Sequence, residues 1–414
     1  MNIKKMRECN KIMDFKIVEG GTITTPKGFL AQGIYAGIKR KKNDLGIIYS
    51  TTPANAAGVY TLNVVQAAPL KLTKEAIKHS KKLQAIVVNS GNANACTGIE
   101  GDKNAYRMQE LVANGLNLPN DMVGVASTGV IGQQLPMDCV ETGIEMALAG
   151  LSEIGGNDFS ESILTTDTIE KNIAVQLEID GEIVSIAGTA KGSGMIHPNM
   201  ATMLGFITTD AGIEHQQLQK LLSNVTDQTF NMITVDGDTS TNDMVIVMAN
   251  GQSNVVLDES HEQWNQYLAA FNHVAEYLAK AIARDGEGAT KLIQVTVKQA
   301  NNYKEAAMIA KSVIGSSLVK SAVFGADANW GRIVAAAGYS GATFDPDKIE
   351  VYLMGTLIFQ NGMGVYFDEE AVQAAMNDEL VTIELCMNQG EQQATAWGCD
   401  LTYDYVRINA SYRT

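Results

Sequence analysis

Short apolar runs that are typical of buried strands alternate along this chain with segments in which apolar residues recur at helical spacing. This alternation indicates a mixed α and β architecture. The strand-like runs are 83–90, 122–128, 244–250, 291–297 and 382–388, and the helix-like segments are 104–117, 214–225 and 261–283. The stretches VQLEID and EIVSIAG meet at Asp180 and Gly181, a pair that tolerates the positive φ angles of a two-residue hairpin turn. We therefore expect a hairpin that leads into the glycine-rich segment KGSGMIHPNMAT.

Composition and charge exclude several classes of protein. The chain has 414 residues, 45% of them hydrophobic, which is enough for two or three packed units. Its 46 acidic and 31 basic residues give a formal net charge of −15, which repels nucleic acid and anionic lipid, so we expect neither as a partner. No apolar run approaches the ~20 residues that span a bilayer, and the N-terminal segment lacks a secretory apolar core. We expect a cytoplasmic protein.

Familiar metal and nucleotide motifs are not found. The five cysteines form no CxxC pair and the five histidines no HExxH pattern, so neither a zinc site nor a histidine-based triad is indicated. The stretch DGDTSTND (236–243) lacks the sixth-position glycine of a calcium loop and is followed by Val247 where the loop needs glutamate. We interpret it as a turn held by its own side chains. Neither KGSG (191–194) nor DGEGATK (285–291) has the spacing of a phosphate loop.

Thr202, in the stretch HPNMATMLGF (197–206), is a candidate nucleophile. A threonine hydroxyl is weak unless a base lies beside it, and an N-terminal threonine can use its own α-amine, whose pKa is about 7.7–8.0. Ala201 leaves its carbonyl open to attack, and Pro198 keeps His197 out of helical conformation. The alternative is a threonine that caps a helix or lines a strand. These residues alone leave both interpretations open.

Seven blocks in order give the chain a resemblance to a known family. They are GGTITTPKGF (20–29), VVNSGNANACTG (87–98), VASTGVIG (125–132), LTTDT (164–168), KGSGMIHPNMATML (191–204), RDGEGATK (284–291) and GADANWGRI (325–333). Together they resemble the ornithine acetyltransferase family from about residue 17 to the C-terminus, and residues 1–16 form an N-terminal extension outside the resemblance. Seven blocks are far more specific than any one of them, and they favour the nucleophile interpretation of Thr202.

The resemblance implies a precursor that cuts itself between Ala201 and Thr202 into an α chain (17–201 after the extension) and a β chain (202–414). The Thr202 hydroxyl would then accept an acetyl group from N2-acetyl-L-ornithine and pass it to L-glutamate, within arginine synthesis. No cofactor is implied, although acetyl-CoA could serve as a second acetyl donor. The sequence does not distinguish enzymes that also use acetyl-CoA from those that only recycle the acetyl group.

The resemblance also assigns roles to individual residues. Thr128 and Gly129 resemble an oxyanion hole, although an ordinary turn at a strand end would look the same. Five further residues match positions that bind substrate, together with Thr202 itself: Thr165, Lys191, Glu287, Asn409 and Thr414. Lys191 would bind an α-carboxylate and Glu287 a cationic group; the alternatives are a solvated loop lysine and a turn carboxylate. A C-terminal segment that contacts substrate must be docked, whereas chain ends are usually frayed. No metal is implied.

The implied fold is an α/β protein, a stacked αββα sandwich that resembles N-terminal-nucleophile hydrolases in its layers, with a smaller C-terminal α/β unit from about residue 290. The implied assembly has two α and two β chains. Two alternatives remain. In a related self-cleaving aminopeptidase or amidohydrolase, water would replace glutamate as acceptor, and the nucleophile is usually serine. A non-catalytic amino-acid-binding relative would be expected to lack Thr202 or the oxyanion pair, and this chain has both.

Overall fold

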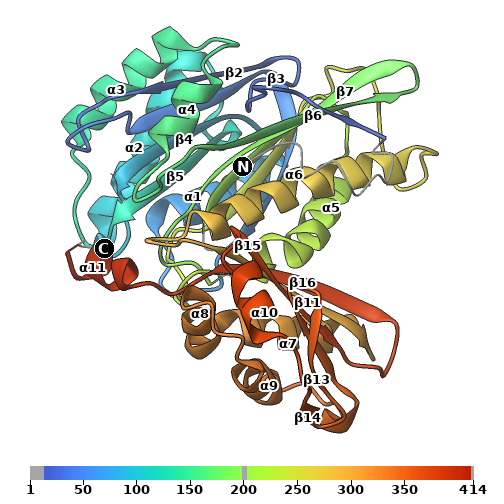
Figure 1. Cartoon of the computed structure of the whole chain (residues 1–414). Coiled ribbons are helices and arrows are strands. Elements are labelled where there is room, and N and C mark those ends of the chain that lie inside the picture. Colours follow the sequence, from blue (N-terminus) through green and yellow to red (C-terminus); the bar gives the residue numbers. More distant parts are fainter. Residues whose placement is uncertain (1–13, 198–202, 412–414) are drawn as a thin grey trace.

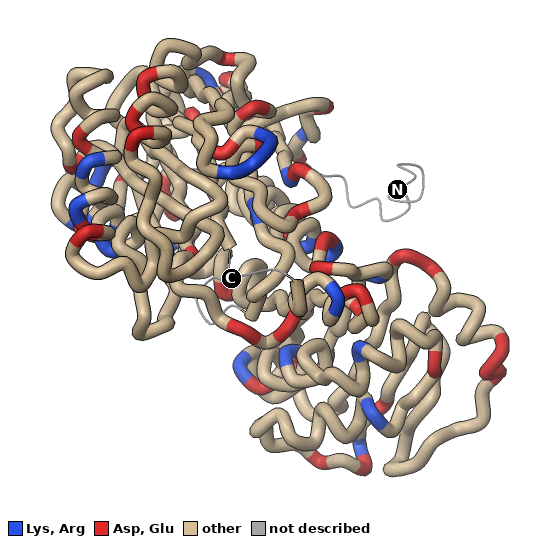
Figure 2. The backbone as a smooth tube through the Cα atoms, turned by 90° about the vertical axis from the view of Figure 1, so that its left-hand side faces the viewer, with Lys and Arg blue, Asp and Glu red and all other residues tan. Residues whose placement is uncertain are grey.

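The structure, a computed structural model, describes residues 14–197 and 203–411. Within these residues the strands form two sheets, one of nine strands and one of seven, both associated with helices (Figure 1). Seen from the side, the chain forms two lobes, and acidic and basic residues are scattered over both (Figure 2). Ala201, Thr202, Thr414 and residues 1–13 of the predicted N-terminal extension lie outside the described residues.

The larger sheet is mixed, with parallel and antiparallel pairs. Its order is β1 (Lys16–Ile17), β6 (Lys171–Ile179), β7 (Glu182–Lys191), β8 (Leu204–Thr209), β10 (Met244–Ala249), β3 (Leu45–Tyr60), β4 (Lys82–Asn92) and β5 (Val123–Val130), and β2 (Phe29–Ile34) also pairs with β3. The pairs β8 with β10 and β4 with β5 are parallel. The expected hairpin is confirmed: β6 and β7 pair antiparallel, and Asp180 and Gly181 have φ angles of 54° and 79°.

The long strand β3 connects two halves of this sheet. Residues 45–50 pair with β2 and β4, and residues 55–60 pair with β10. Side chains alternate along a strand, so each half of the sheet has two faces. Both faces of each half contribute buried residues to the hydrophobic cores. One face of both halves contributes to a shared core, which includes Ile48 of β3, Ile86 of β4 and Phe206 of β8. The halves are therefore stacked face to face across this core.

Helices cover the outer faces of the two halves. On one side, α5 (His215–Gln228) and α6 (Trp264–Arg284) pack on the half that contains β6, β7 and β8. On the other side, α2 (Gly98–Leu116) and α3 (Met137–Gly150) pack against β3, β4 and β5. The helices α1 (Ala68–Ser80) and α4 (Gly156–Ser162) add side chains to the shared core. This order of helices, sheet, sheet and helices confirms the αββα sandwich expected from the resemblance.

The helical spacing seen in the sequence explains how α6 packs. Its buried residues Tyr267, Phe271, Val274 and Leu278 recur every three or four positions and so lie on one face of the helix. The helix α5 begins after Glu214, whose carboxylate accepts a hydrogen bond from the amide of Gln216. Both predicted segments, 214–225 and 261–283, are helices whose ends differ from the expectation by one to three residues.

The smaller sheet builds the second lobe. Its order is β14 (Met363–Gly364), β13 (Thr356–Gln360), β12 (Glu350–Leu353), β15 (Leu380–Cys386), β11 (Leu292–Ala300), β16 (Gln392–Cys399) and β9 (Ile233–Thr234). The helices after β11 are α7 (Tyr303–Gly315), α8 (Ser317–Phe324), α9 (Trp330–Gly338), α10 (Glu369–Ala375) and α11 (Tyr403–Ser411). The strand β9 belongs to the smaller sheet, and the next strand along the chain, β10, belongs to the larger one. The stretch 233–244 therefore connects the two sheets.

In the part of the chain that the structure describes, no single helix is long and apolar enough to cross a membrane. The helices α7 and α8 together have the length and composition of a membrane span, but the pair is bent by 56°.

Candidate active site

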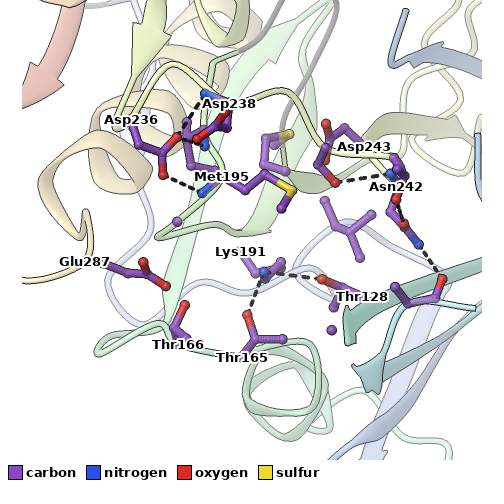
Figure 3. Close-up of a pocket in the computed structure, with 18 of the residues that line it drawn as sticks. Thr128, Thr165, Thr166, Lys191, Met195, Asp236, Asp238, Asn242, Asp243 and Glu287 are labelled. Carbon is purple, nitrogen blue, oxygen red and sulfur yellow. Dashed lines mark hydrogen bonds between the residues drawn. The ribbon is translucent and has the colours of Figure 1, made fainter. Parts of the chain in front are cut away.

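A cavity of about 210 Å³ lies where segments from distant parts of the chain converge (Figure 3). Six of the predicted site residues line it: Thr128, Gly129, Thr165, Lys191, Glu287 and Asn409. Ala201, Thr202 and Thr414 lie outside the described residues, but Met203, which directly follows Thr202, also lines the cavity. The structure therefore brings together every predicted site residue that it describes.

Lys191, the last residue of β7, lies between two threonine hydroxyl groups. Its Nζ donates to Oγ1 of Thr165 at 2.8 Å and to Oγ1 of Thr128 at 3.4 Å (Figure 3). Only 8% of Lys191 is exposed. An ammonium group can only donate, so both hydroxyl oxygens accept from it and each keeps its own proton for another acceptor. A substrate oxygen in the cavity could accept those protons.

Gly129 follows Thr128 at the end of β5 and has a φ angle of 134°. A Cβ atom there would lie 2.3 Å from the carbonyl carbon of Gly91 on the neighbouring strand β4. Glycine is needed because the two backbones approach so closely. The asparagine-rich loop beside it is buried and hydrogen-bonded: Asn92 donates to the carbonyls of Gln133 and Gln134, each at 3.1 Å.

Asp167 is a buried carboxylate behind Lys191. Its oxygens accept from the amide of Gly192 at 2.6 Å, the amide of Thr165 at 3.0 Å and Nζ of Lys171 at 2.8 Å, and one lies 3.8 Å from Nζ of Lys191. Burial opposes the charged carboxylate, but the positive charges of Lys191 and Lys171 and the hydrogen bonds outweigh it and hold the pKa of Asp167 well below its usual value. Asp167 thus orients Thr165 and stays charged beside Lys191.

A second carboxylate, Asp285, completes this buried group. It accepts from Nζ of Lys171 at 2.6 Å and from the amide and hydroxyl of Thr168. The blocks LTTDT and RDGEGATK meet through these contacts, although 117 positions separate Thr168 from Asp285. Sequence reasoning singled out Thr165 and Glu287 in these blocks and missed Asp167, Lys171 and Asp285. Asp167 and Asp285 each stand in a matched block, but the surrounding residues are polar and gave no local signal that these side chains are buried together.

Glu287 and Asn409 hold the C-terminal helix against the cavity. The Asn409 side chain donates to Oε2 of Glu287 at 2.7 Å, and Glu287 is only 7% exposed. The carboxylate occupies space beside Gly194, where an added Cβ would lie 2.4 Å from it. The part of the C-terminal segment that the structure describes is therefore docked at the site, as a substrate-contacting segment requires.

The stretch 236–243 is a turn held by its own side chains, as predicted, because the amide of Asp238 donates to Asp236 and the amide of Asn242 to Ser240, each at 3.2 Å. The stretch also lines the cavity. Asp236 accepts from the amides of Met195 and Ile196, and Asn242 donates to the carbonyls of Ala93 and Ser127. Sequence reasoning missed this contribution to the site. The only signal was the density of Asp, Asn, Ser and Thr directly before a strand, which is also typical of an ordinary turn.

The ArgJ family model matches residues 30–414. The chain belongs to the ArgJ family. An ArgJ relative from Oceanobacillus iheyensis, called the arginine biosynthesis bifunctional protein ArgJ, is 55% identical over 408 residues, which cover 98% of this chain and all of that protein. The ArgJ of Listeria monocytogenes serotype 4b is 55% identical over 397 residues, which cover 95% of this chain and 99% of that one.

Two solved structures are also similar to this chain. A crystal structure of the arginine biosynthesis bifunctional protein ArgJ from Bacillus halodurans is 50% identical, covers 45% of this chain and 98% of its own, and has a TM-score of 0.43. The ornithine acetyltransferase from Mycobacterium tuberculosis, solved in complex with ornithine, is 35% identical, covers 45% of this chain and all of its own, and has a TM-score of 0.43.

Proposed function

We propose that this ArgJ family member is a self-cleaving glutamate N-acetyltransferase that moves the acetyl group of N2-acetyl-L-ornithine to L-glutamate in arginine biosynthesis. The names of its full-length relatives support the pathway. The observation that carries the chemistry is that Met203, the neighbour of Thr202, lines one cavity with Thr128, Lys191 and Glu287. A nucleophile, an oxyanion donor and a pair of opposite charges would thus share one small space.

Self-cleavage would produce the active nucleophile. The Thr202 hydroxyl attacks the Ala201 carbonyl carbon, the peptide C–N bond breaks, and the released amine takes up the proton. Water then hydrolyses the ester to give the Ala201 carboxylate and a free Thr202 hydroxyl. The new α-amine, with a pKa of about 7.7–8.0, acts as the base for the same hydroxyl in the transfer reaction.

The transfer would then proceed by double displacement. Thr202 attacks the acetyl carbonyl of acetylornithine, its proton passes by way of the α-amine to the leaving nitrogen, and ornithine departs. The amine of glutamate then attacks the acetyl ester, the bond between the acetyl carbon and the Thr202 oxygen breaks, and N-acetylglutamate leaves as the proton returns to the hydroxyl. The Thr128 hydroxyl and the Gly129 amide would stabilise the negative charge that develops on the acetyl oxygen. Lys191 would bind the α-carboxylate that donor and acceptor share, and Glu287 a cationic group, with Thr165, Asn409 and Thr414 completing the site.

Several features of this proposal concern the whole assembly. The precursor would yield an α chain ending at Ala201 and a β chain starting at Thr202, and two of each would form a heterotetramer in the cytoplasm. Residues 1–16 would form an N-terminal extension of the α chain. No cofactor is needed, and acetyl-CoA would act as a second donor substrate. Measuring glutamate acetylation with acetylornithine and with acetyl-CoA in separate assays tests the choice of donor.

Self-cleavage predicts two chains in the purified active protein. N-terminal sequencing of the downstream chain should begin TMLGF, and Thr202→Ala should yield one uncut, inactive chain. Denaturing gels, intact mass and the acetyl-transfer assay measure these outcomes. A fully active enzyme that consists of one intact chain would exclude the proposal.

A single nucleophile that serves both substrates predicts parallel lines in double-reciprocal plots when glutamate is varied at several fixed acetylornithine concentrations. Incubation with acetylornithine alone should add one acetyl group to the downstream chain. Intersecting lines without an acetylated chain would mean direct transfer between the two bound substrates, and Thr202 would then serve cleavage only.

A further inference from the structure

One stretch of chain, residues 233–244, contacts both sides of the segment in which the proposed cleavage occurs. Upstream of that segment, the carbonyl of Ile196 accepts from the amide of Val235 at 2.7 Å, and the carbonyl of His197 accepts from the Thr239 hydroxyl at 3.0 Å. Downstream of it, the carbonyl of Met203 accepts from the amide of Met244 at 3.0 Å. The last described residues before the segment and the first after it are therefore held by the same stretch.

Asp236, near the start of this stretch, binds the upstream flank through both oxygens of its carboxylate. One carboxylate oxygen accepts from the amide of Met195 at 2.7 Å (Figure 3). The other accepts from the amide of Ile196 at 2.9 Å. Hydrogen bonds to an ionised carboxylate are shorter and stronger than those between neutral groups. Both oxygens of one side chain thus hold two consecutive amides of the upstream flank.

The backbone that Asp236 holds is one that a methionine rarely adopts. Met195 has a φ angle of 56°, in the left-handed region, where the Cβ atom of an ordinary residue crowds the backbone. Such a conformation persists only when surrounding contacts impose it. The two hydrogen bonds that Asp236 accepts hold the amides on either side of the Met195 α-carbon, those of Met195 and Ile196, and so help to impose this conformation.

We propose that Asp236 is a positioning residue for self-cleavage, which fixes the direction in which the chain approaches the cut bond. This inference rests on the proposed function. Asp236 need not touch the reacting atoms; it acts through the amides of Met195 and Ile196. Intramolecular attack depends steeply on geometry, and a displacement of about 1 Å can cost about 100-fold in rate. Residues 233–244 thus have a role in processing besides lining the cavity.

The test compares Asp236→Asn with a matched control in newly made protein. The control is Asp210→Asn, because Asp210 is also a carboxylate that accepts from two amides, those of Ser185 at 2.8 Å and Lys27 at 3.0 Å. Asp210 follows the far end of β8, away from the cavity. Time courses of cell-free synthesis, resolved on denaturing gels, give the cleavage rate. We expect Asp236→Asn to cleave about 10- to 100-fold more slowly, and Asp210→Asn at the rate of the unsubstituted chain.

A second variant and a chemical probe separate positioning from general damage. Thr239→Val removes only the hydroxyl that holds the His197 carbonyl, so cleavage should slow in the same direction by a smaller factor. Hydroxylamine cleaves esters, so it should not restore cleavage in Asp236→Asn if the initial attack is the slow step. Melting temperatures of Asp236→Asn and Asp210→Asn precursors should be similar.

The inference is overturned if Asp236→Asn and Thr239→Val cleave at the unsubstituted rate, or if hydroxylamine restores cleavage in Asp236→Asn, because the ester would then form normally. It is also overturned if the slow cleavage follows a melting temperature far below that of Asp210→Asn. If the unsubstituted chain itself never cleaves, the proposed function fails instead. The two failures are therefore distinguishable.

Discussion

Lys191 has two structural roles that a solvated loop lysine would not have. Its Nζ lies within hydrogen-bond distance of the hydroxyls of Thr165 and Thr128, and Asp167 lies behind it at 3.8 Å. The sequence suggested only a partner for a substrate carboxylate. The structure adds that Lys191 sets the direction in which the Thr128 hydroxyl donates, because that oxygen accepts from the ammonium group.

Lys191→Met should therefore raise the KM for both substrates and also lower kcat. We expect kcat to fall about 10-fold. This loss is smaller than the ~10²–10³-fold loss of kcat expected when Thr128→Ala removes an oxyanion donor. Steady-state kinetics with varied acetylornithine and varied glutamate measure both parameters. Lys220→Met, which removes an exposed lysine paired with Glu259, is the control and should change neither. A change in KM alone would mean that Lys191 only binds substrate.

At the scale of elements, the buried group of Asp167, Lys171 and Asp285 joins the start of β6 to the end of α6. Lys171 is fully buried, so its charge needs both carboxylates. The group thereby fixes the loop that carries Thr165 against the end of β7, where Lys191 lies. Buried ion pairs thus hold together β6 and α6, which are far apart in the sequence, beside the cavity.

Asp167→Asn should lower the free energy of unfolding at pH 7 by about 3–5 kcal/mol, because it leaves Lys171 partly unpaired in the interior. The pKa of Asp167 is lowered in the folded chain, so its stabilising effect is present above the unfolded-state pKa of about 3.9 and is lost as the pH falls below it. The deficit of Asp167→Asn should thus shrink in acid.

Urea unfolding at pH 7 and at about pH 2.5, well below the unfolded-state pKa, measures both effects. Glu259→Gln serves as the control, because the pair of Lys220 and Glu259 is exposed and its loss should leave the free energy of unfolding little changed at either pH. A deficit for Asp167→Asn that is the same at both pH values would contradict the charge argument.

At the scale of the whole molecule, the proposed cut divides the chain between strands that belong to one sheet, so both products contribute to it. The strand β8, which begins at Leu204, pairs with β7 on one side and β10 on the other, and β10 pairs with β3. The two strands that follow the cut, β8 and β10, therefore lie between strands that precede it, β7 on one side and β3 on the other. The shared core of the sandwich likewise contains residues from both sides of the cut.

The two products of cleavage should consequently remain associated. We expect them to co-elute in gel filtration without denaturant and to separate only under conditions that unfold the sheet, such as high urea. Separation of the chains in native buffer would contradict the strand order described here. Uncut Thr202→Ala should elute at the same position, because cleavage leaves the sheet intact.

Local features of the sequence were sufficient for individual elements. The hairpin at Asp180 and Gly181 and the helix spanning 264–284 depend on turn geometry and on side-chain periodicity, which neighbouring residues determine. The layered fold and six of the site residues came from matching blocks to a family. Periodicity alone would not have indicated that β3 connects two stacked halves, because that depends on which strands pair across the sheet.

The sequence by itself determined the types of element, the acidic net charge and the candidate nucleophile, since each depends on composition or on short spacings. Only the tertiary structure decided which groups the carboxylates of Asp236 and Asp285 bind. Asp236 reaches Met195 across 41 positions, and Asp285 reaches Thr168 across 117. Nothing local favours these contacts; they form because burial of the apolar faces brings β7, α6 and the stretch 233–244 together, and buried polar groups must then be paired.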